Sequence, residues 1–214
     1  MKKLLLLSLL AAFTALTTRA ADQDWTSMFN GKDLAGWKSN DETPGVFFVT
    51  NGVLKVNGGR AHLFYAGADG QASFKNFEFK AKVLTTPGSN SGIYFHTEFQ
   101  AKDWPAKGFE CQVNTTHTDQ KKTGGLYAVQ DVMNNAPSKD FEWFDYYIKV
   151  EGRHVVIQIN GKTTVDWTQP EDWDPKKSLK NMDGRKLGEG TIALQGHDPK
   201  STTFYKDFFI RALP

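Results

Sequence analysis

From Trp25 onward the chain alternates apolar and polar residues with a period of two, and two Asn-Gly pairs interrupt the alternation. These pairs lie within VFFVTNGVLKV at 46–56 and VVIQINGKTTVDW at 155–167. Alternation is typical of strands with one buried face, and Asn-Gly supplies the positive φ angles of a tight hairpin turn. No stretch of a dozen residues keeps an apolar stripe at helical spacing, so the pattern predicts an almost entirely β protein.

Further segments follow the same pattern, among them NFEFKAKVL at 76–84 and FYKDFFIRAL at 204–213. Many strands at regular spacing without crossover helices indicate antiparallel sheets stacked as a sandwich. We expect a single-domain, all-β jelly roll. Two segments, 115–137 and 169–188, lack the alternation and are predicted to be long loops, which on a rigid scaffold are typical of binding loops or lids.

The first twenty residues, MKKLLLLSLLAAFTALTTRA, have the pattern of a secretory signal peptide: a basic start, an apolar run and small residues at the exit. The apolar run is too short for a membrane span. We therefore expect cleavage near Ala20 or Ala21, one domain over 25–214, and a protein that is periplasmic or secreted, with no membrane partner.

Charge excludes some partners. The formal net charge is +2, and signal cleavage removes Lys2, Lys3 and Arg19 but no acid. A near-neutral chain without a basic block gives no reason to expect nucleic acid or anionic lipid. Cys111 is the single cysteine, which excludes an intramolecular disulfide, and its strand position predicts a small buried residue and not a nucleophile.

Three predicted strands share a polar face: SNSGIYFHTEF at 89–99, GFECQV at 108–113 and GTIALQGHD at 190–198. Because successive side chains point to opposite sides of a sheet, Phe95, Phe109 and Leu194 are expected in the core. The opposite face then carries Tyr94, His96, Glu110, Gln112, Gln195 and His197. Two imidazoles and a carboxylate on one face favour acid–base chemistry or metal binding.

Glu110 is the strongest single candidate. It lies in mid-strand between Phe109 and Cys111, where a carboxylate must find partners or acquire a raised pKa, and a raised pKa suits a general acid or base. The alternative is a solvated charge on an exposed sheet face. A single histidine such as His96 or His197 is more often structural or merely exposed than catalytic. A role in catalysis is favoured only because both share the predicted face with Glu110. His62, His117 and His154 lack such company and are interpreted as surface residues.

Aromatic residues near turns offer flat surfaces on which sugar rings could stack, with core packing as the rival interpretation. They are Trp104, Tyr127, Trp143 and Trp173. The ExDxxE strand of laminarinase-like glucanases is absent, because positions 112 and 115 are Gln and Thr. A two-carboxylate glycosidase would therefore lack its second acid on this strand.

Seven short motifs occur in order: FNGKDLAGW from 29, NSGIY from 90, GFECQ from 108, GGLY from 124, EW at 142–143, the Asn-Gly hairpin at 160–161, and LQGH from 194. Together they resemble the 3-keto-disaccharide hydrolase domain family, secreted bacterial proteins with a concanavalin-like jelly roll. The resemblance covers essentially the whole mature chain. It places Asn90, Glu110, Gln112, Tyr127 and His197 on family motif positions, whereas His96 and Phe144 stand where the motifs carry Arg and Asn.

The resemblance implies an enzyme that acts on glycosides already oxidised at C3 of the sugar. A 3-ketone acidifies the C2–H bond, so the glycosidic bond can break by elimination across C1–C2, with hydration afterwards. Glu110 or His197 would be the catalytic base. Asn90, Gln112 or a divalent metal held by some of Glu110, His96 and His197 would stabilise the developing oxyanion.

The remaining substrate contacts expected on this face are Tyr94, His96, Tyr127, Trp143 and Gln195. The alternative from another class is a non-catalytic, lectin-like carbohydrate-binding module, since the same sandwich serves both functions. The His–Glu–His face favours the enzyme. In either case the expected partner is a carbohydrate.

Overall fold

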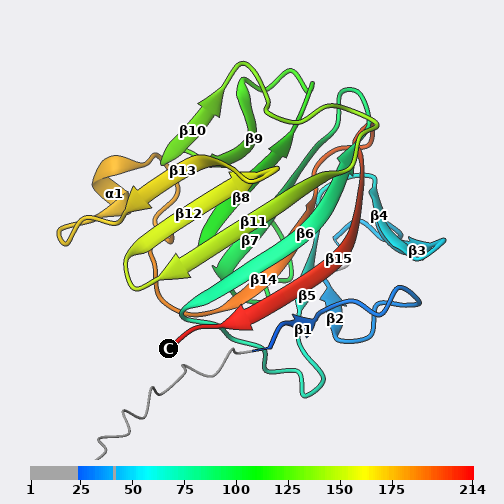
Figure 1. Cartoon of the computed structure of the whole chain (residues 1–214), viewed down its shortest axis with the longest axis horizontal. Coiled ribbons are helices and arrows are strands. Elements are labelled where there is room, and N and C mark those ends of the chain that lie inside the picture. The colour runs from blue at the N-terminus through cyan, green and yellow to red at the C-terminus, as the bar shows by residue number, and fades with distance from the viewer. Residues whose placement is uncertain (1–23, 41) are drawn as a thin grey trace, which may run out of the picture.

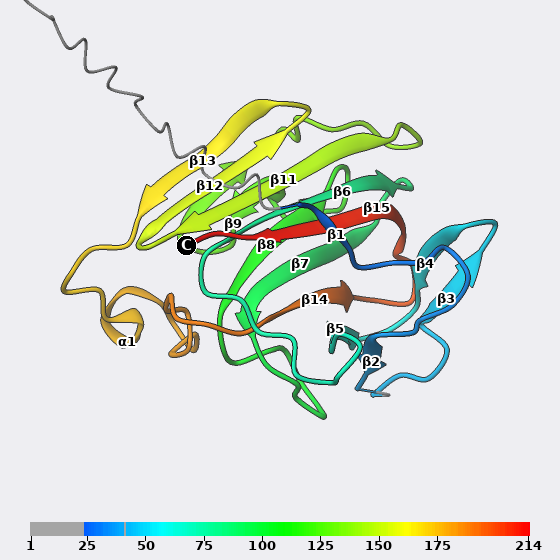
Figure 2. The ribbon, with the colours of Figure 1, turned by 60° about the horizontal axis from the view of Figure 1, so that its bottom comes forward.

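The computed structural model describes residues 24–40 and 42–214, which form two antiparallel β-sheets packed face to face (Figures 1 and 2). The predicted signal peptide lies outside the described residues. Within the described part of the chain, no helix has the length and hydropathy needed to cross a membrane. The helix that is present there, α1 (Pro175–Ser178), has a single turn.

The first sheet has the strand order β13-β12-β11-β6-β15-β4-β3, with β1 paired to β15. Its strands are β1 (Thr26–Ser27), β3 (Phe47–Thr50), β4 (Val53–Asn57), β6 (Phe77–Thr85), β11 (Phe144–Glu151), β12 (His154–Ile159), β13 (Lys162–Thr168) and β15 (Thr202–Ala212).

The second sheet has the order β10-β9-β8-β7-β14-β5-β2. Its strands are β2 (Trp37–Ser39), β5 (Ala61–Tyr65), β7 (Asn90–Thr97), β8 (Phe109–Asn114), β9 (Lys121–Leu126), β10 (Gln130–Met133) and β14 (Thr191–Gly196). All strand pairs in both sheets are antiparallel, which confirms the predicted sandwich.

Both predicted Asn-Gly hairpins are confirmed. Asn51 and Gly52 connect β3 to β4 with φ angles of 50° and 78°, and Asn160 and Gly161 connect β12 to β13 with φ angles of 51° and 75°. Positive φ at both turn residues is the backbone geometry for which Asn-Gly is suited. The turns therefore fix the registers of the strands that they join.

One apolar core fills the space between the sheets. Phe77 and Phe79 enter it from β6, and Phe95, Phe109 and Leu194 enter it from the second sheet, all fully buried as predicted. Cys111 is also buried there. Because these residues occupy the inner face of β7, β8 and β14, the alternate residues of the same strands lie on the outer face, where the site is found.

The long loop predicted for 115–137 is wrong in part, because β9 and β10 lie within it. Gly124 and Gly125 interrupt the alternation of β9, and a Cβ at Gly125 would come within 2.8 Å of the Val132 backbone nitrogen on β10. Glycine is needed there for close strand approach, and it hides the strand from a hydrophobicity pattern. The segment 169–188 is irregular as predicted: it leaves β13 in the first sheet, passes through α1 and reaches β14 in the second (Figure 2).

Candidate active site

A cavity of about 660 Å³ lies on the outer face of the second sheet. Its floor carries side chains of β7, β8 and β14, and its walls come from the loops around them. The lining includes Asn90, Tyr94, Trp104, Glu110, Gln112, Tyr127, Arg185, Gln195 and His197. The three strands singled out from the sequence therefore do form one site.

Glu110 is the buried carboxylate of this cavity, with its side chain 8% exposed. The Tyr94 hydroxyl donates a hydrogen bond to Oε2 over 2.8 Å, and Gln195 Nε2 donates to Oε1 over 2.9 Å. Tyr94 lies on β7, directly opposite Glu110 in the pairing of β7 with β8, and Gln195 lies on β14, the next strand beyond β7. Two strands on the same side of β8 thus hold the carboxylate in one orientation.

Gly92 makes room for that carboxylate. A Cβ at Gly92 would lie 2.7 Å from Glu110 Oε1 and 3.1 Å from its Cγ. The backbone φ at this glycine is not in the positive range, so the need for glycine is one of space. The family-like NSGIY motif therefore includes a residue whose absent side chain admits Glu110.

Burial raises the pKa of the Glu110 carboxyl, and the opposing effects of Arg185, Tyr94 and Gln195 do not cancel this rise. Burial also raises the pKa of Tyr94 well above its usual value, reinforced by the Glu110 charge, so its hydroxyl remains a donor. A carboxylate with a raised pKa is a stronger base when ionised than an exposed one. This property was predicted from its place between two buried neighbours.

Arg185 is the charged partner of Glu110 and was not identified from the sequence. Its Nη2 lies 3.5 Å from Glu110 Oε2, its Nη1 donates to the Gly108 carbonyl over 3.1 Å, and its guanidinium lies 5.3 Å from the centre of the Tyr94 ring. The indole of Trp173 donates to the Arg185 carbonyl over 2.7 Å and fixes the loop. The sequence predicts a binding loop over 169–188, but it does not indicate which side chain of that loop enters the cavity.

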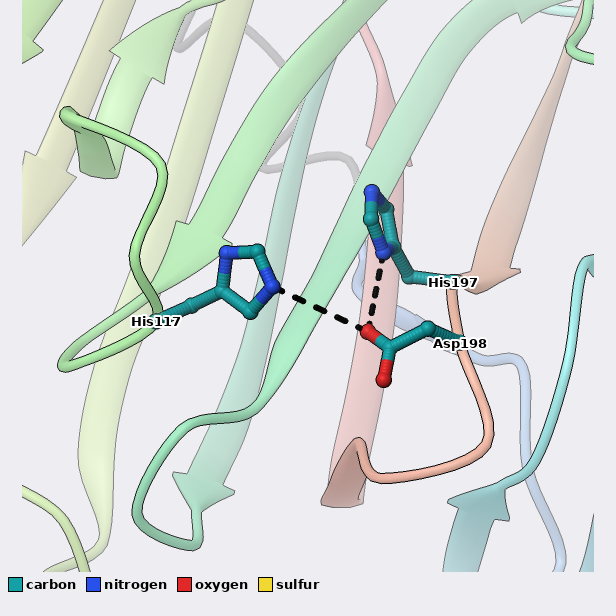
Figure 3. A group of neighbouring side chains, drawn as sticks. All are labelled: His117, His197 and Asp198. Carbon is teal, nitrogen blue, oxygen red and sulfur yellow. Dashed lines mark hydrogen bonds and ion pairs between the residues drawn. The ribbon is translucent and has the colours of Figure 1, made fainter.

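His197 follows β14 and lines the cavity, and its neighbour Asp198 orients it. His197 Nδ1 lies 3.0 Å from Asp198 Oδ2, with both side chains about one-third exposed (Figure 3). A neutral imidazole that donates from Nδ1 has a lone pair on Nε2, the arrangement found in general-base histidines. The Trp104 ring lies 5.4 Å from the imidazole and adds an exposed aromatic surface beside it.

Comparison with known proteins identifies the family of the chain. A family model described as the 3-keto-alpha-glucoside-1,2-lyase-like domain matches residues 24–211. The chain belongs to this family. The 3-keto-disaccharide hydrolase of Bacteroides thetaiotaomicron is 26% identical over 81% of this chain and 73% of the relative.

Several solved structures share the fold of this chain. A crystal structure of a presumed glycosyl hydrolase from Parabacteroides distasonis has a TM-score of 0.74 at 22% identity, covering 89% of this chain and 94% of that one. The VIP36 exoplasmic domain, solved with Ca²⁺ and Man3GlcNAc, has a TM-score of 0.58 at 10% identity over 87% of each chain. The sandwich is therefore of the concanavalin-like type expected from the sequence.

His96 lies elsewhere, contrary to the prediction that it shares the face with Glu110. Its φ is 53°, and two β7 residues, Phe95 and His96, oppose the single residue Ile192 of β14. Such a bulge breaks the alternation of side chains. The ring instead contacts Phe77, and Nε2 donates to the Lys75 carbonyl over 2.8 Å while Nδ1 accepts from the Gly188 N–H.

The metal-ligand set of Glu110, His96 and His197 is therefore not assembled. His96 is buried among backbone partners, and burial lowers its pKa to about 4. Trp143 is also not brought to the cavity: it precedes β11 of the first sheet, where its ring lies 4.4 Å from Lys206 Nζ. Its predicted place near a turn suggested a sugar contact, but the sequence does not show beside which sheet a loop residue lies.

Two of the histidines interpreted from the sequence as surface residues do not lie on the open surface in the structure. His62 is fully buried, in edge contact with the rings of Tyr94 and Trp104, and neither of its ring nitrogens has a hydrogen-bond partner within the described residues. His117 is partly buried, and its ring centre lies 5.5 Å from that of His197. The 115–120 turn carries it there, which strand alternation alone does not predict.

The other predicted contacts, Asn90, Gln112 and Tyr127, all line the cavity. The buried side-chain oxygens Asn90 Oδ1 and Gln195 Oε1 have no hydrogen-bond partner within the described residues. Buried acceptors are normally paired, so these two are suited to hydroxyl donors of a bound ligand.

Proposed function

We propose that this protein cleaves glycosides whose sugar ring carries a ketone at C3, by elimination across C1–C2 followed by addition of water. The observation that carries the proposal is the Glu110 carboxylate, buried in the cavity and held by Arg185, Tyr94 and Gln195. Family membership and the names of the relatives support the same substrate class.

Glu110 is the proposed base. It takes the C2 proton, the C2–H electrons form the enolate, and the enolate then expels the alcohol from C1 as the C1–C2 double bond forms. The raised pKa of Glu110 suits removal of a proton made acidic by the neighbouring ketone. The proton that leaves C2 and the one that joins the departing oxygen balance, so no oxidant or reductant is required.

Arg185 and His197 complete the machinery. Arg185 is a permanent cation in the cavity wall beside the base, and it is the proposed electrostatic partner of the enolate oxygen. His197, held by Asp198, also lines the cavity and can carry a proton, and it is assigned to the leaving-group side. The unpaired oxygen of Gln195 accepts a sugar hydroxyl, and Trp104 gives a stacking surface.

The N-terminal sequence supports a further element of the proposal, that the protein works in the periplasm or outside the cell. Its substrates would then be products of an enzyme that oxidises the C3 hydroxyl of a glycoside. The sequence motif for export is the basis of this assignment.

The test is turnover of an aryl 3-keto-glucoside, with the unoxidised aryl glucoside as the control. We expect cleavage of the 3-keto-glucoside and not of the unoxidised glucoside. The Glu110→Gln variant should be at least about 100-fold less active, the loss typical of a missing general base. Saturable binding of sugars without cleavage of any 3-keto-glycoside, with or without added divalent metal, would instead show a carbohydrate-binding module.

A further inference from the structure

Beside the cavity, three potential metal ligands meet that no strand pattern predicted together. Within the described residues, His117, His197 and Asp198 form a group whose ligand atoms all lie within 4.8 Å of one another. His197 Nδ1 lies 3.0 Å and His117 Nε2 lies 3.9 Å from the same oxygen, Asp198 Oδ2 (Figure 3). Two segments 80 residues apart in the sequence thus bring three potential metal-ligand atoms together.

Hydrogen bonds fix the segment that carries His117. Asn114 Oδ1 accepts from the His117 backbone N–H over 2.9 Å, and its Nδ2 donates to the carbonyls of Asp119 and Lys121. The buried ammonium of Lys122 donates to the His117 carbonyl over 2.6 Å. The imidazole is therefore presented by a preorganised turn, as a metal ligand must be.

Asp198 is fixed as firmly. Its Oδ2 accepts from the Ser201 hydroxyl over 2.6 Å, and its Oδ1 accepts from the Lys200 N–H over 2.9 Å. These bonds hold Oδ2 where it faces both imidazoles, 3.0 Å from His197 Nδ1 and 3.9 Å from His117 Nε2.

Asn90 supplies an independent observation. The residue is 2% exposed, its Oδ1 has no hydrogen-bond partner within the described residues, and its Nδ2 lies 3.5 Å from His117 Nδ1. A histidine that ligates through Nε2 carries its proton on Nδ1 and needs an acceptor there. Rotation of the Asn90 amide by 180° would place the unpaired oxygen opposite that proton, in exchange for the contact that Nδ1 now accepts from the Asp119 N–H.

We propose that His117 Nε2, His197 Nδ1 and Asp198 Oδ2 form a binding site for one divalent transition-metal ion at the wall of the cavity. Two imidazoles and one carboxylate suit Zn²⁺, Mn²⁺ or Co²⁺ better than Mg²⁺ or Ca²⁺, which prefer oxygen ligands. Three protein ligands leave positions for water or for ligand oxygens. With Nδ1 occupied, His197 would present a proton on Nε2 to the cavity as a donor.

The site differs from the set expected from the sequence, since Glu110 and His96 take no part. The proposal does not depend on the proposed function, because occupancy is measurable without turnover. Loss of activity with intact metal binding would contradict the function alone, and absent metal binding in an active enzyme would contradict the site alone.

The experiment uses the untagged mature protein, stripped with a chelator and titrated with Zn²⁺ in a calorimeter. We expect one equivalent to bind. His117→Ala, His197→Ala and Asp198→Asn should each weaken Zn²⁺ binding by at least about 10-fold, and Asn90→Ala should weaken it by about 10-fold through the orientation of His117. His154→Ala is the matched control, because the exposed side chain of His154 pairs with the exposed Asp166 over 2.7 Å, and the change should not affect binding.

A second measurement needs no variant. Mn²⁺ added to the stripped wild-type protein should broaden the nuclear magnetic resonance signals of the His117 and His197 rings, while the His154 ring signals remain sharp. The absence of stoichiometric Zn²⁺ binding, or Mn²⁺ broadening that is no stronger at His117 and His197 than at His154, would overturn the proposal.

Discussion

The guanidinium of Arg185 lies 3.5 Å from the carboxylate of Glu110, and both side chains are almost completely buried. The two residues come from a β-strand and from an irregular loop 75 positions later. Removal of one partner of a buried pair leaves an uncompensated charge and costs about 3–5 kcal/mol, unless the remaining group becomes neutral. The pair therefore links the conformation of the loop to the protonation of Glu110.

Arg185→Gln should lower kcat/KM by at least about 100-fold, as expected when an electrostatic partner of the reaction is lost. Because Arg185 holds the pKa of Glu110 down against the effect of burial, the acid limb of the pH–rate profile should also move to higher pH. Arg153→Gln, which removes an exposed pair with Glu171, is the control and should change neither quantity. A profile in Arg185→Gln with an unmoved acid limb would argue against coupling of the two groups.

Gly92→Ala tests the position of the Glu110 carboxylate without removing it. The added Cβ would lie 2.7 Å from Oε1, so the carboxylate must move and the activity should fall by at least about 10-fold. Gly188→Ala introduces the same methyl group where no atom lies within 4 Å, and it should be close to neutral in activity. Equal activities in the two variants would show that the precise placement of Glu110 is unimportant.

Glu110→Gln should change the pH dependence of stability in a defined direction. The pKa of Glu110 is raised in the folded state, so just above pH 4.5 the folded protein retains a proton that the unfolded chain has lost. Ionisation of Glu110 therefore lowers the free energy of unfolding as pH rises through this window. Glutamine does not ionise and has no such effect. The Tm of the variant relative to wild type should increase as pH rises from about 4; a constant difference would contradict the raised pKa.

His62→Phe should flatten the loss of stability in acid. Burial lowers the pKa of His62 from 6.5 to about 3, so between these values the unfolded chain binds a proton that the folded protein excludes. Wild-type stability should fall as pH decreases through this range, by about 1.4 kcal/mol for each pH unit at most. Phenylalanine fills a similar volume among Tyr94 and Trp104. Denaturant titrations at several pH values measure the slope, and an unchanged slope would contradict the burial of a neutral imidazole.

His96→Asn should affect stability and not chemistry. Asparagine tolerates the positive φ of this position, but it loses the ring contact with Phe77 and the imidazole bonds to Lys75 and Gly188. We expect a loss of about 1–3 kcal/mol in the free energy of unfolding, while the turnover number of the folded enzyme stays within a few-fold of wild type. Turnover slowed by about 100-fold, the loss typical of a missing acid or base, together with an unchanged Tm, would place His96 back in the reaction.

Period-two alternation predicted the sandwich and the inward position of Phe95, Phe109 and Leu194, because burial of one sheet face enforces that pattern. The same alternation placed Tyr94, Glu110, Gln112 and Gln195 on a common face. It did not predict the position of His96, since the bulge adds one residue to β7 and reverses the parity. Nor did it identify Arg185 or His117, because the paths of loops depend on particular hydrogen bonds that hydrophobicity does not encode.

In the proposed mechanism, Glu110 removes the C2 proton of a 3-keto-glycoside. The most direct measurement follows deuterium at C2 of a 3-keto-glucoside during turnover by mass spectrometry. We expect C2 deuterium to be lost to solvent and, where proton abstraction limits the rate, deuteration to slow the reaction. Full retention of C2 deuterium in a cleaved product would contradict elimination and would indicate direct hydrolysis of the glycosidic bond.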